Sequence, residues 1–207
     1  MADASNDGRS PASPEPGRYL FWEEASPFFS AVVTAQVASE AWQLAAYYDL
    51  RRAVFAEEQH LFEASDIDEH DASATPIVAL GHMGGMPDEV IGTVRIYPAE
   101  PGTWWGGRLG VLPRYRSRRI VGTSLICAAV STAHAWGCRR FFATIQLQNV
   151  RYFERHRFRT IREVEVCGAP HHLMEADLSA YPARAAVAGQ AVDGDYAVSL
   201  FGPRMAA

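Results

Sequence analysis

The chain has 207 residues, of which 48% are hydrophobic and 21% are charged, and its formal net charge is −5. This length and composition fit one compact domain with tails and exclude two full domains. The longest apolar stretch, residues 120–136, is interrupted by Ser, Thr and His, so we expect a soluble protein without a membrane-spanning helix. The N-terminus lacks a basic segment followed by an apolar one, and three cysteines are too few for a disulfide scaffold, so we expect a cytoplasmic location.

Charge is distributed unevenly along the chain. Residues 108–162 contain twelve arginines and one acidic residue, Glu154, whereas the remainder is strongly acidic. The chain has no lysine, and guanidinium groups bind phosphate as planar forks that keep their charge when partly buried. A GC-rich genome would also replace lysine by arginine, but it would not gather the arginines in one segment. The pattern therefore predicts that this half of the chain binds an anion.

A tail, a strand and a helix are predicted in the N-terminal part. Residues 1–24 are rich in Pro, Ser, Asp and Glu without apolar periodicity, which is typical of a flexible tail. The apolar, β-branched run over residues 28–37 predicts a first strand. Apolar residues then recur at helical spacing over residues 40–59, behind Ser39 as an N-cap, which predicts a helix.

Three strands follow. Residues 76–82 and 89–97 are joined by the turn-rich sequence HMGGMPD, which predicts an antiparallel hairpin. After a second turn, residues 104–112 predict a third strand of the same sheet.

The middle of the chain predicts a strand-loop-helix-strand unit. An arginine-rich loop over residues 113–121 leads into a helix over residues 122–136, and Gly137 stands where a left-handed helix end is expected. Residues 138–147 predict the next strand, and residues 149–156 predict a short helix.

The remaining elements complete one domain. Residues 160–166 and 171–176 predict two closing strands, and residues 196–201 predict only a weak strand. We therefore expect a domain over residues 25–180 and a C-terminal extension over residues 181–207.

The sequence PRYRSRRIVG, which ends a strand and opens a helix, has the composition of an anion site. It places unpaired backbone N–H groups, the positive end of a helix dipole and several guanidinium groups together. Three or four charge-assisted hydrogen bonds, each contributing about 1.5–3 kcal/mol when shielded, would hold a diphosphate. The sequence shows no metal-ligand spacing of His, Cys and acidic residues here. A solvated basic loop is the alternative interpretation.

Family motifs are recognisable in the arginine-rich half. One long segment of this half resembles motifs A and B of the GNAT acyltransferases. Its sequence is RLGVLPRYRSRRIVGTSLICAAVSTAHAWGCRRFFATIQLQNVRYFERHRF. The resemblance extends upstream to LRRAVFAEEQHLFEASDIDEHD and downstream to GAPHHLMEADL, and it looks closest to a bacterial subfamily associated with nitrogen starvation. It implies an α+β fold with a mixed, mostly antiparallel central sheet, flanked by helices and splayed between its fourth and fifth strands.

The resemblance also implies that acetyl-CoA, or another acyl-CoA, is the co-substrate. Because the arginine-rich turn can hold a diphosphate by itself and no metal-ligand spacing is present there, we expect no metal. Pantetheine amides would bind the splayed fourth strand as an extra strand, and the turn before the helix would bind the diphosphate. The expected coenzyme-binding residues are Leu109, Gly110, Val111, Arg116, Ser117, Arg118, Arg119, Val121, Gly122, Thr123, Asn149 and Phe153. Bulky Arg119 or Ile120 replaces a small residue of the family's turn, which predicts a shifted diphosphate site with compensating arginines.

An amine acceptor must lose a proton before or during its attack on a thioester. The resemblance places the acidic segment of residues 40–71 beside the acceptor cleft. Within it, Glu58 is the predicted base, and Asp68 and Glu69 are expected to shape a pocket for a cation. A solvated acidic surface is the alternative interpretation.

Two further residues are candidates for proton transfer. The tyrosine that protonates the leaving thiolate in this family aligns with Phe153, and the adjacent Tyr152 is the candidate acid, with packing as its alternative role. His171 and His172 alternate in a predicted strand, so at most one faces the cleft. His172 is the candidate base near neutral pH, and a structural role is its alternative.

These features predict an acyl-CoA-dependent N-acyltransferase, in which a small-molecule amine attacks the thioester in a ternary complex. The sequence VFAEEQ followed by DIDEHD also resembles acyl-homoserine-lactone synthases, which use S-adenosylmethionine. Outside enzymes, the alternatives are a non-catalytic acyl-CoA sensor and a nucleic-acid-binding protein. For the preferred function we expect neither a membrane nor a nucleic acid as partner, and a homodimer could form through the C-terminal extension.

Overall fold

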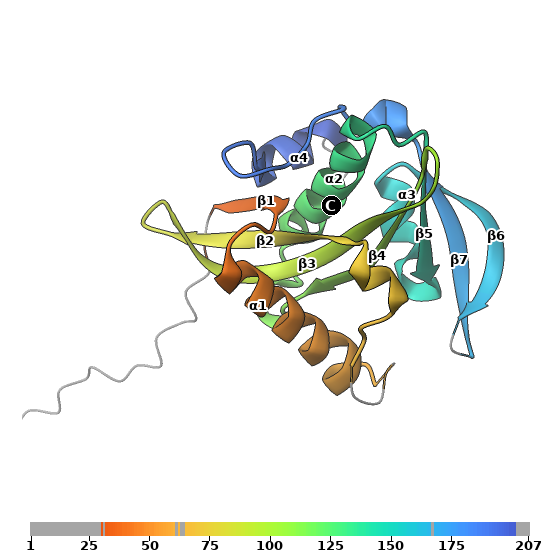
Figure 1. Cartoon of the computed structure of the whole chain (residues 1–207), viewed down its shortest axis with the longest axis horizontal. Coiled ribbons are helices and arrows are strands. Elements are labelled where there is room, and N and C mark those ends of the chain that lie inside the picture. The colour runs from red at the N-terminus through yellow and green to blue at the C-terminus, as the bar shows by residue number, and fades with distance from the viewer. Residues whose placement is uncertain (1–29, 31, 61, 63–64, 167, 202–207) are drawn as a thin grey trace, which may run out of the picture.

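The computed structural model of the chain describes residues 30, 32–60, 62, 65–166 and 168–201 (Figure 1). In chain order, the strands and helices are β1 (Val33–Val37), α1 (Ala41–Arg51), β2 (Thr75–Met83), β3 (Met86–Glu100), β4 (Thr103–Val111), α2 (Arg119–Ala135), β5 (Arg140–Gln146), α3 (Val150–Arg155), β6 (Phe158–Val166), β7 (Ala169–Ala176), β8 (Val192–Asp193) and α4 (Gly194–Phe201). A π-helical segment, Arg52–Glu58, continues α1.

One eight-stranded sheet organises the described residues, in the order β6-β7-β5-β4-β3-β2-β1-β8. Neighbouring strands are antiparallel except β4 and β5, which are parallel. This arrangement confirms the predicted α+β class with a mixed, mostly antiparallel sheet. Strands β4 and β5 pair only from Thr103–Arg140 to Gly106–Ala143 and then diverge, which confirms the predicted splay.

Helix α1 packs on one face of the sheet, and α2 packs on the other (Figure 1). Strand alternation supplies both cores, because Val78 and Leu80 of β2 face α1 whereas Ile77 and Ala79 face α2. All residues of α2 from 121 to 133 are buried, since α4 and the segment before it cover the outer side of this helix.

The helix predicted over residues 40–59 is present as α1 and its π-helical continuation. Its N-cap is Glu40, so the prediction of Ser39 was wrong. The Oε1 atom of Gln43 accepts hydrogen bonds from the backbone N–H groups of Ser39 (3.0 Å) and Glu40 (3.3 Å), which places the helix start one residue later.

The arginine-rich loop is shorter than predicted. Helix α2 begins at Arg119, three residues before the predicted start, because a single 3₁₀ turn over Pro113–Tyr115 already reverses the chain. The backbone N–H of Arg118 then donates to the carbonyl of Tyr115 (3.0 Å). Gly137 has a φ of 91°, which confirms the predicted left-handed helix end.

The C-terminal segment differs from its prediction as a weak strand over residues 196–201, because Gly194–Phe201 form the helix α4. The Oδ1 atom of Asp193 accepts hydrogen bonds of 2.9 and 3.2 Å from two backbone N–H groups of the first turn. Helical spacing also places Ala197 and Phe201 on one buried face. Both effects favour the helix over an extended strand.

Two predictions at the N-terminus fall partly or wholly outside the described residues. The tail over residues 1–24 lies wholly outside, and the strand predicted over residues 28–37 is observed from Val33. Within the part of the chain that the structure describes, no helix combines the length and apolarity needed to cross a bilayer.

Candidate active site

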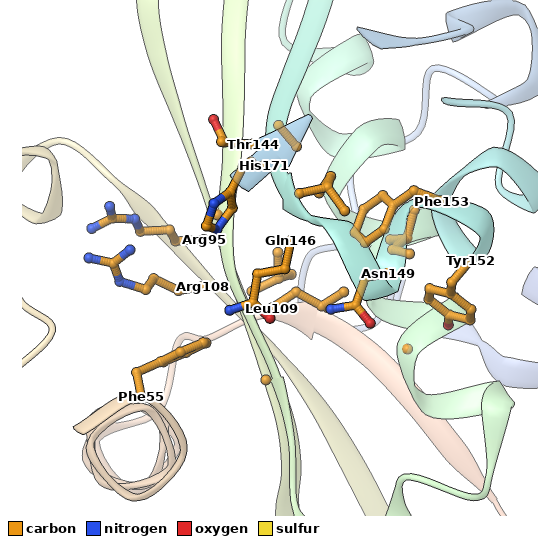
Figure 2. Close-up of a pocket in the computed structure, with 18 of the residues that line it drawn as sticks. Phe55, Arg95, Arg108, Leu109, Thr144, Gln146, Asn149, Tyr152, Phe153 and His171 are labelled. Atoms are coloured by element: carbon orange, nitrogen blue, oxygen red, sulfur yellow. The ribbon is translucent and has the colours of Figure 1, made fainter. Parts of the chain in front are cut away.

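The divergence of β4 and β5 lies at a cavity of about 1300 Å³ (Figure 2). The π-helical segment after α1 contributes Phe55 and Glu58 to one wall, and β7 contributes His171. The first turn of α2 and helix α3 form the opposite end, where Gly122 and Tyr152 lie. The cavity therefore extends from the α1 face of the sheet to the start of α2.

Strand β4 carries a bulge just beyond the point where β5 leaves it. The register of β3 and β4 shifts beside the Arg95–Gly107 pair, so that Arg108 and Leu109 together oppose one residue of β3. Arg108 has a φ of 55°, in the left-handed region that residues with a side chain rarely adopt. The bulge interrupts the ladder where the edge of β4 borders the cavity.

A buried ion network lies between α1 and the sheet. Arg51 is fully buried, and its guanidinium group binds Asp66 (Nε to Oδ2, 2.7 Å), Asp71 (Nη1 to Oδ1, 2.5 Å) and the hydroxyl of Tyr47 (2.9 Å). Burial raises the pKa of Tyr47 to about 12, although the charge of Arg51 opposes the rise. These contacts hold residues 66–71 against α1.

Two arginines of the sheet join this network. Arg95 of β3 binds Asp68 through two hydrogen bonds (2.7 and 2.6 Å) and Asp71 through a third (2.7 Å). Arg108 of β4 donates to the carbonyl of Asp66 (2.8 Å) and to Asp68 (3.1 Å). Burial favours a higher pKa for Asp68, but hydrogen bonds and charge from Arg95 outweigh it and lower the pKa. Asp68 thus borders the cavity as a partner of two cations.

Glu58 and Arg116 form a bidentate ion pair at the edge of the cavity. Both hydrogen bonds measure 2.6 Å, and each side chain is 41% exposed. Arg116 also donates from Nε to the carbonyl of Val111 (3.0 Å). The hydrogen bonds from Arg116 lower the pKa of Glu58, which weakens this carboxylate as a proton acceptor. The residue predicted as base and a residue predicted to bind phosphate therefore neutralise each other.

The turn before α2 brings two arginines and a helix N-terminus to the cavity. Arg118 and Arg119 line it, and Arg118 also donates a hydrogen bond to the carbonyl of Ser30. A Cβ atom on Gly122 would lie 2.5 Å from the phenolic oxygen of Tyr152. Tyr152 therefore covers the first turn of α2, on the opposite side of the cavity from Arg95 and Arg108 in Figure 2. Burial raises its pKa.

The two adjacent histidines of β7 have different surroundings. His171 lines the cavity, and its Nδ1 atom lies 2.9 Å from the carbonyl oxygen of Ala169. A carbonyl oxygen can only accept, so Nδ1 donates this hydrogen bond. His172 does not line the cavity, and its Nδ1 atom lies 2.9 Å from Oγ1 of Thr160. Alternation along the strand thus selects His171 for the cavity.

Most of the predicted site residues come together in the cavity. Its lining includes Glu58, Leu109, Gly110, Val111, Arg116, Arg118, Arg119, Gly122, Asn149, Tyr152 and Phe153. The predicted residues that do not line it are Ser117, Val121, Thr123 and His172. Val121 and Thr123 are buried, and Oγ1 of Thr123 lies 3.0 Å from Nε2 of His156. Glu69, expected beside a bound cation, has an exposed side chain and does not line the cavity.

The described lining has arginines at both ends and includes the imidazole of His171. Its acidic residues are Glu58 and Asp68, and both are ion-paired. Within the described ranges, no group of three or more His, Cys, Asp or Glu residues could hold a metal ion.

Among the cavity residues that sequence analysis did not name as site residues are two arginines, Arg95 and Arg108. The available signal was the position of Arg95 in β3, where it alternates with the buried residues Val94 and Ile96 and is itself buried. A charged residue within a buried strand needs partners from elsewhere in the fold, and the acidic segment of residues 66–71 supplies them.

Solved structures share this fold. A Lactobacillus plantarum protein provisionally assigned as an N-acetyltransferase matches with a TM-score of 0.63 and 26% identity, over 70% of this chain and 98% of that chain. Escherichia coli ElaA matches with a TM-score of 0.57 and 24% identity, over 70% and 99% of the two chains. The CoA-dependent acyl-homoserine lactone synthase BjaI, solved with SAM and isopentyl-CoA, matches with a TM-score of 0.58 and 18% identity, over 70% and 83%.

The family assignment comes from the sequence. No curated protein matches the chain. The sequence model of the acetyltransferase (GNAT) family, however, matches residues 36–158, which extend from β1 to the first residue of β6. This range covers more than half of the chain and includes the splayed strands and the arginine-rich turn. The chain therefore belongs to the acetyltransferase (GNAT) family.

Proposed function

We propose that this protein transfers an acyl group from acyl-CoA, with acetyl-CoA as the first candidate, to a small-molecule amine. The observation that carries the proposal is the separation of β4 from β5 after the Gly106–Ala143 pair, beside a cavity of about 1300 Å³. An extended chain of amides can add to a strand edge of this kind through main-chain hydrogen bonds. The pantetheine arm is such a chain, and Leu109, Gly110 and Val111 offer the edge.

The phosphate groups bind at the turn before α2 in this proposal. Arg118 and Arg119 line the cavity there, and the N-terminus of α2 adds the positive end of a helix dipole. The side chains of Val121 and Thr123 are buried, and Ser117 does not line the cavity. These three residues can therefore contact the coenzyme only through their backbone. Asn149 and Phe153 border the same end.

In the transfer step, the amine nitrogen attacks the thioester carbonyl carbon. A C–N bond forms, the C–S bond breaks, and the products are an amide and the free thiol of CoA. The sulfur of CoA takes up the proton that the amine loses, so the reaction is balanced. A backbone N–H beside the β4 bulge stabilises the carbonyl oxygen as its negative charge grows.

His171 is the proposed proton acceptor, in place of His172. His171 lines the cavity, and the hydrogen bond from Nδ1 to the carbonyl of Ala169 orients the ring and leaves Nε2 as the atom that accepts the proton in this proposal. Glu58 acts through Arg116 instead, because it orients this arginine at the cavity edge. Tyr152, which covers the start of α2, forms a wall beside the coenzyme.

A free-thiol assay with acyl-CoA substrates of increasing chain length and a panel of amines tests this function, with products identified by mass spectrometry. His171→Gln should lower kcat about 100-fold while acyl-CoA binding stays intact. His172→Gln, the adjacent residue on the opposite face, is the matched control and should retain turnover. Equal turnover by both variants would remove His171 from the reaction.

Calorimetry with acyl-CoA and, separately, with a short DNA duplex distinguishes the alternatives. Acyl-CoA binding without turnover of any amine would indicate a sensor. Binding of the duplex alone, with steep salt dependence, would contradict the proposed function.

A further inference from the structure

A buried hydrogen-bond donor borders the cavity without a partner. The side chain of Arg95 is 4% exposed, and its two Nη atoms bind Asp68 and Asp71. Its Nε atom is buried and has no hydrogen-bond partner among the described residues. An unsatisfied buried donor is costly, and more so in a charged group, so such an atom requires an explanation.

The space beside this nitrogen is open because the facing residue is glycine. A Cβ atom built on Gly107 would lie 3.8 Å from Nε of Arg95, and no other described residue beyond its chain neighbours comes within 4 Å. Gly107 lines the cavity and pairs with Arg95 across β3 and β4. Its φ is not in the left-handed region, so the backbone does not require glycine here. Glycine instead leaves room for a ligand atom beside Nε.

The next residue, Arg108, adds a second cation to this space. Its side chain is 18% exposed and lines the cavity, and its backbone is held in the left-handed region at the bulge. Burial and the charge of Arg95 lower the pKa of Arg108, whereas the pKa of Arg95 itself is raised by its carboxylate partners despite burial. A negative charge bound nearby would therefore stabilise the charged form of the Arg108 guanidinium group. Strained backbone of this kind is concentrated at ligand sites.

Among the described lining residues, no carboxylate is free to bind a cationic substrate group. Both acidic residues of the described lining are ion-paired, Asp68 with Arg95 and Arg108, and Glu58 with Arg116. An anion, by contrast, finds the unpartnered Nε donor of Arg95. Arg108 adds a second guanidinium group there, although it also binds Asp66 (2.9 Å) and Asp68 (3.1 Å).

We infer that the acyl acceptor carries a carboxylate, which binds beside Gly107 and accepts hydrogen bonds from Nε of Arg95 and from Arg108. The inference rests on the proposed function and narrows its amine to amino acids. His171 lines the same cavity as Arg95 and Arg108 (Figure 2), so the proposed base and the proposed carboxylate site open into one space. The surrounding lining residues Phe55, Phe62 and Trp105 favour an apolar side chain on the acceptor.

Matched acceptors test the carboxylate. A panel of L-amino acids is compared with the α-amide and the decarboxylated amine of each, by kcat/KM in the free-thiol assay. The same compounds are titrated by calorimetry into the full chain saturated with CoA, so that binding is measured without turnover. At least one amino acid should exceed its amide and its amine at least tenfold in both measurements.

Gly107→Ala tests the place of binding. Its methyl group makes an ordinary contact with Arg95, so the variant should fold and bind CoA, but it fills the space for the carboxylate oxygen. The preference for acid over amide should fall at least tenfold. Arg108→Gly suits the left-handed backbone and should also lose the preference.

The outcomes separate this inference from the proposed function. Turnover of amides and decarboxylated amines at the rate of the acids would overturn the carboxylate site, whereas the proposed acyltransferase function would still hold. Binding of acids that depends on Gly107, without acyl transfer, would support the site and contradict the function. No acid preference in either binding or turnover would overturn the inference, as would an unchanged ratio in Gly107→Ala.

Discussion

Arg116 holds Glu58 through two hydrogen bonds of 2.6 Å, although 58 residues separate the two in the chain. Because Arg116 also binds the carbonyl of Val111, the pair ties the π-helical segment after α1 to the end of β4. The ion pair thus positions an arginine at the cavity and lowers the pKa of the carboxylate at the same time. In the proposed reaction, the imidazole of His171 therefore accepts the proton in place of Glu58.

Glu58→Gln should therefore retain kcat within about threefold, since the pair neither reacts nor stabilises the fold strongly. Both side chains are 41% exposed, and exposed ion pairs contribute about 0–1 kcal/mol. Steady-state kinetics and urea denaturation measure both quantities. A loss of kcat near that of His171→Gln, at unchanged stability, would restore Glu58 as the base.

Arg51→Met should lower the free energy of unfolding by about 3–5 kcal/mol, because it leaves buried Asp66 and Asp71 without their main cation. Arg52→Met is the matched control. This adjacent side chain is 59% exposed, and its ion pairs with Asp49 and Glu57 are on the surface, so the change should stay within about 0.5 kcal/mol. Equal losses for the two variants, measured by urea denaturation, would contradict the role of the network.

The buried imidazole of His156 should make stability depend on pH. Burial lowers its pKa to about 4, whereas the unfolded chain has the ordinary value near 6.5. The unfolded state therefore binds a proton that the native state does not, and stability is complete above pH 6.5 and decreases as the pH falls towards 4. The expected slope reaches about 1.4 kcal/mol per pH unit.

Denaturation at pH 7, 6 and 5 measures this slope. His156→Gln should remove it, and His70→Gln, a change at an exposed histidine, should keep it. A His156 imidazole signal that titrates near pH 6.5 by NMR would be inconsistent with the prediction.

Gly122→Ala should destabilise the protein by about 1–3 kcal/mol, because the new methyl group would lie 2.5 Å from the phenolic oxygen of Tyr152. The double variant Gly122→Ala with Tyr152→Phe lacks that oxygen and should recover part of the lost stability. The nearest remaining atom, Cζ of the ring, lies 3.4 Å from the new methyl group. Thermal unfolding of both single variants and the double variant measures the coupling. Additive changes would show that the two residues do not contact each other.

The sequence was most informative where local pattern decides the structure. Alternation over residues 76–82 and 89–97, the left-handed end at Gly137 and the splayed parallel pair all follow from neighbours in the chain or from the family motif. The weak strand over residues 196–201 failed because alternation and helical spacing coincide in so short an apolar run. The cap of α1 was misplaced because the Gln43 side chain decides it.

The site could be predicted only where its residues follow one another in the chain. Arg118, Arg119 and Gly122 lie in one turn, and they line the cavity as expected. The ion network instead unites α1, the segment of residues 66–71, β3 and β4, and its acidic members resemble an exposed charged loop in sequence. Pairing between Glu58 and Arg116 likewise depends on long-range packing, which residue types alone do not encode.

Strand β8 pairs with β1 through Thr34–Asp193 and Ala35–Val192, and α4 covers α2 beside it. The segment beyond the family match thus shields a backbone edge that would otherwise be open to strand addition by another molecule. A fragment ending at residue 180 would keep every residue proposed for catalysis and lose this protection. Self-association, more than loss of chemistry, is the hazard that such a truncation would introduce.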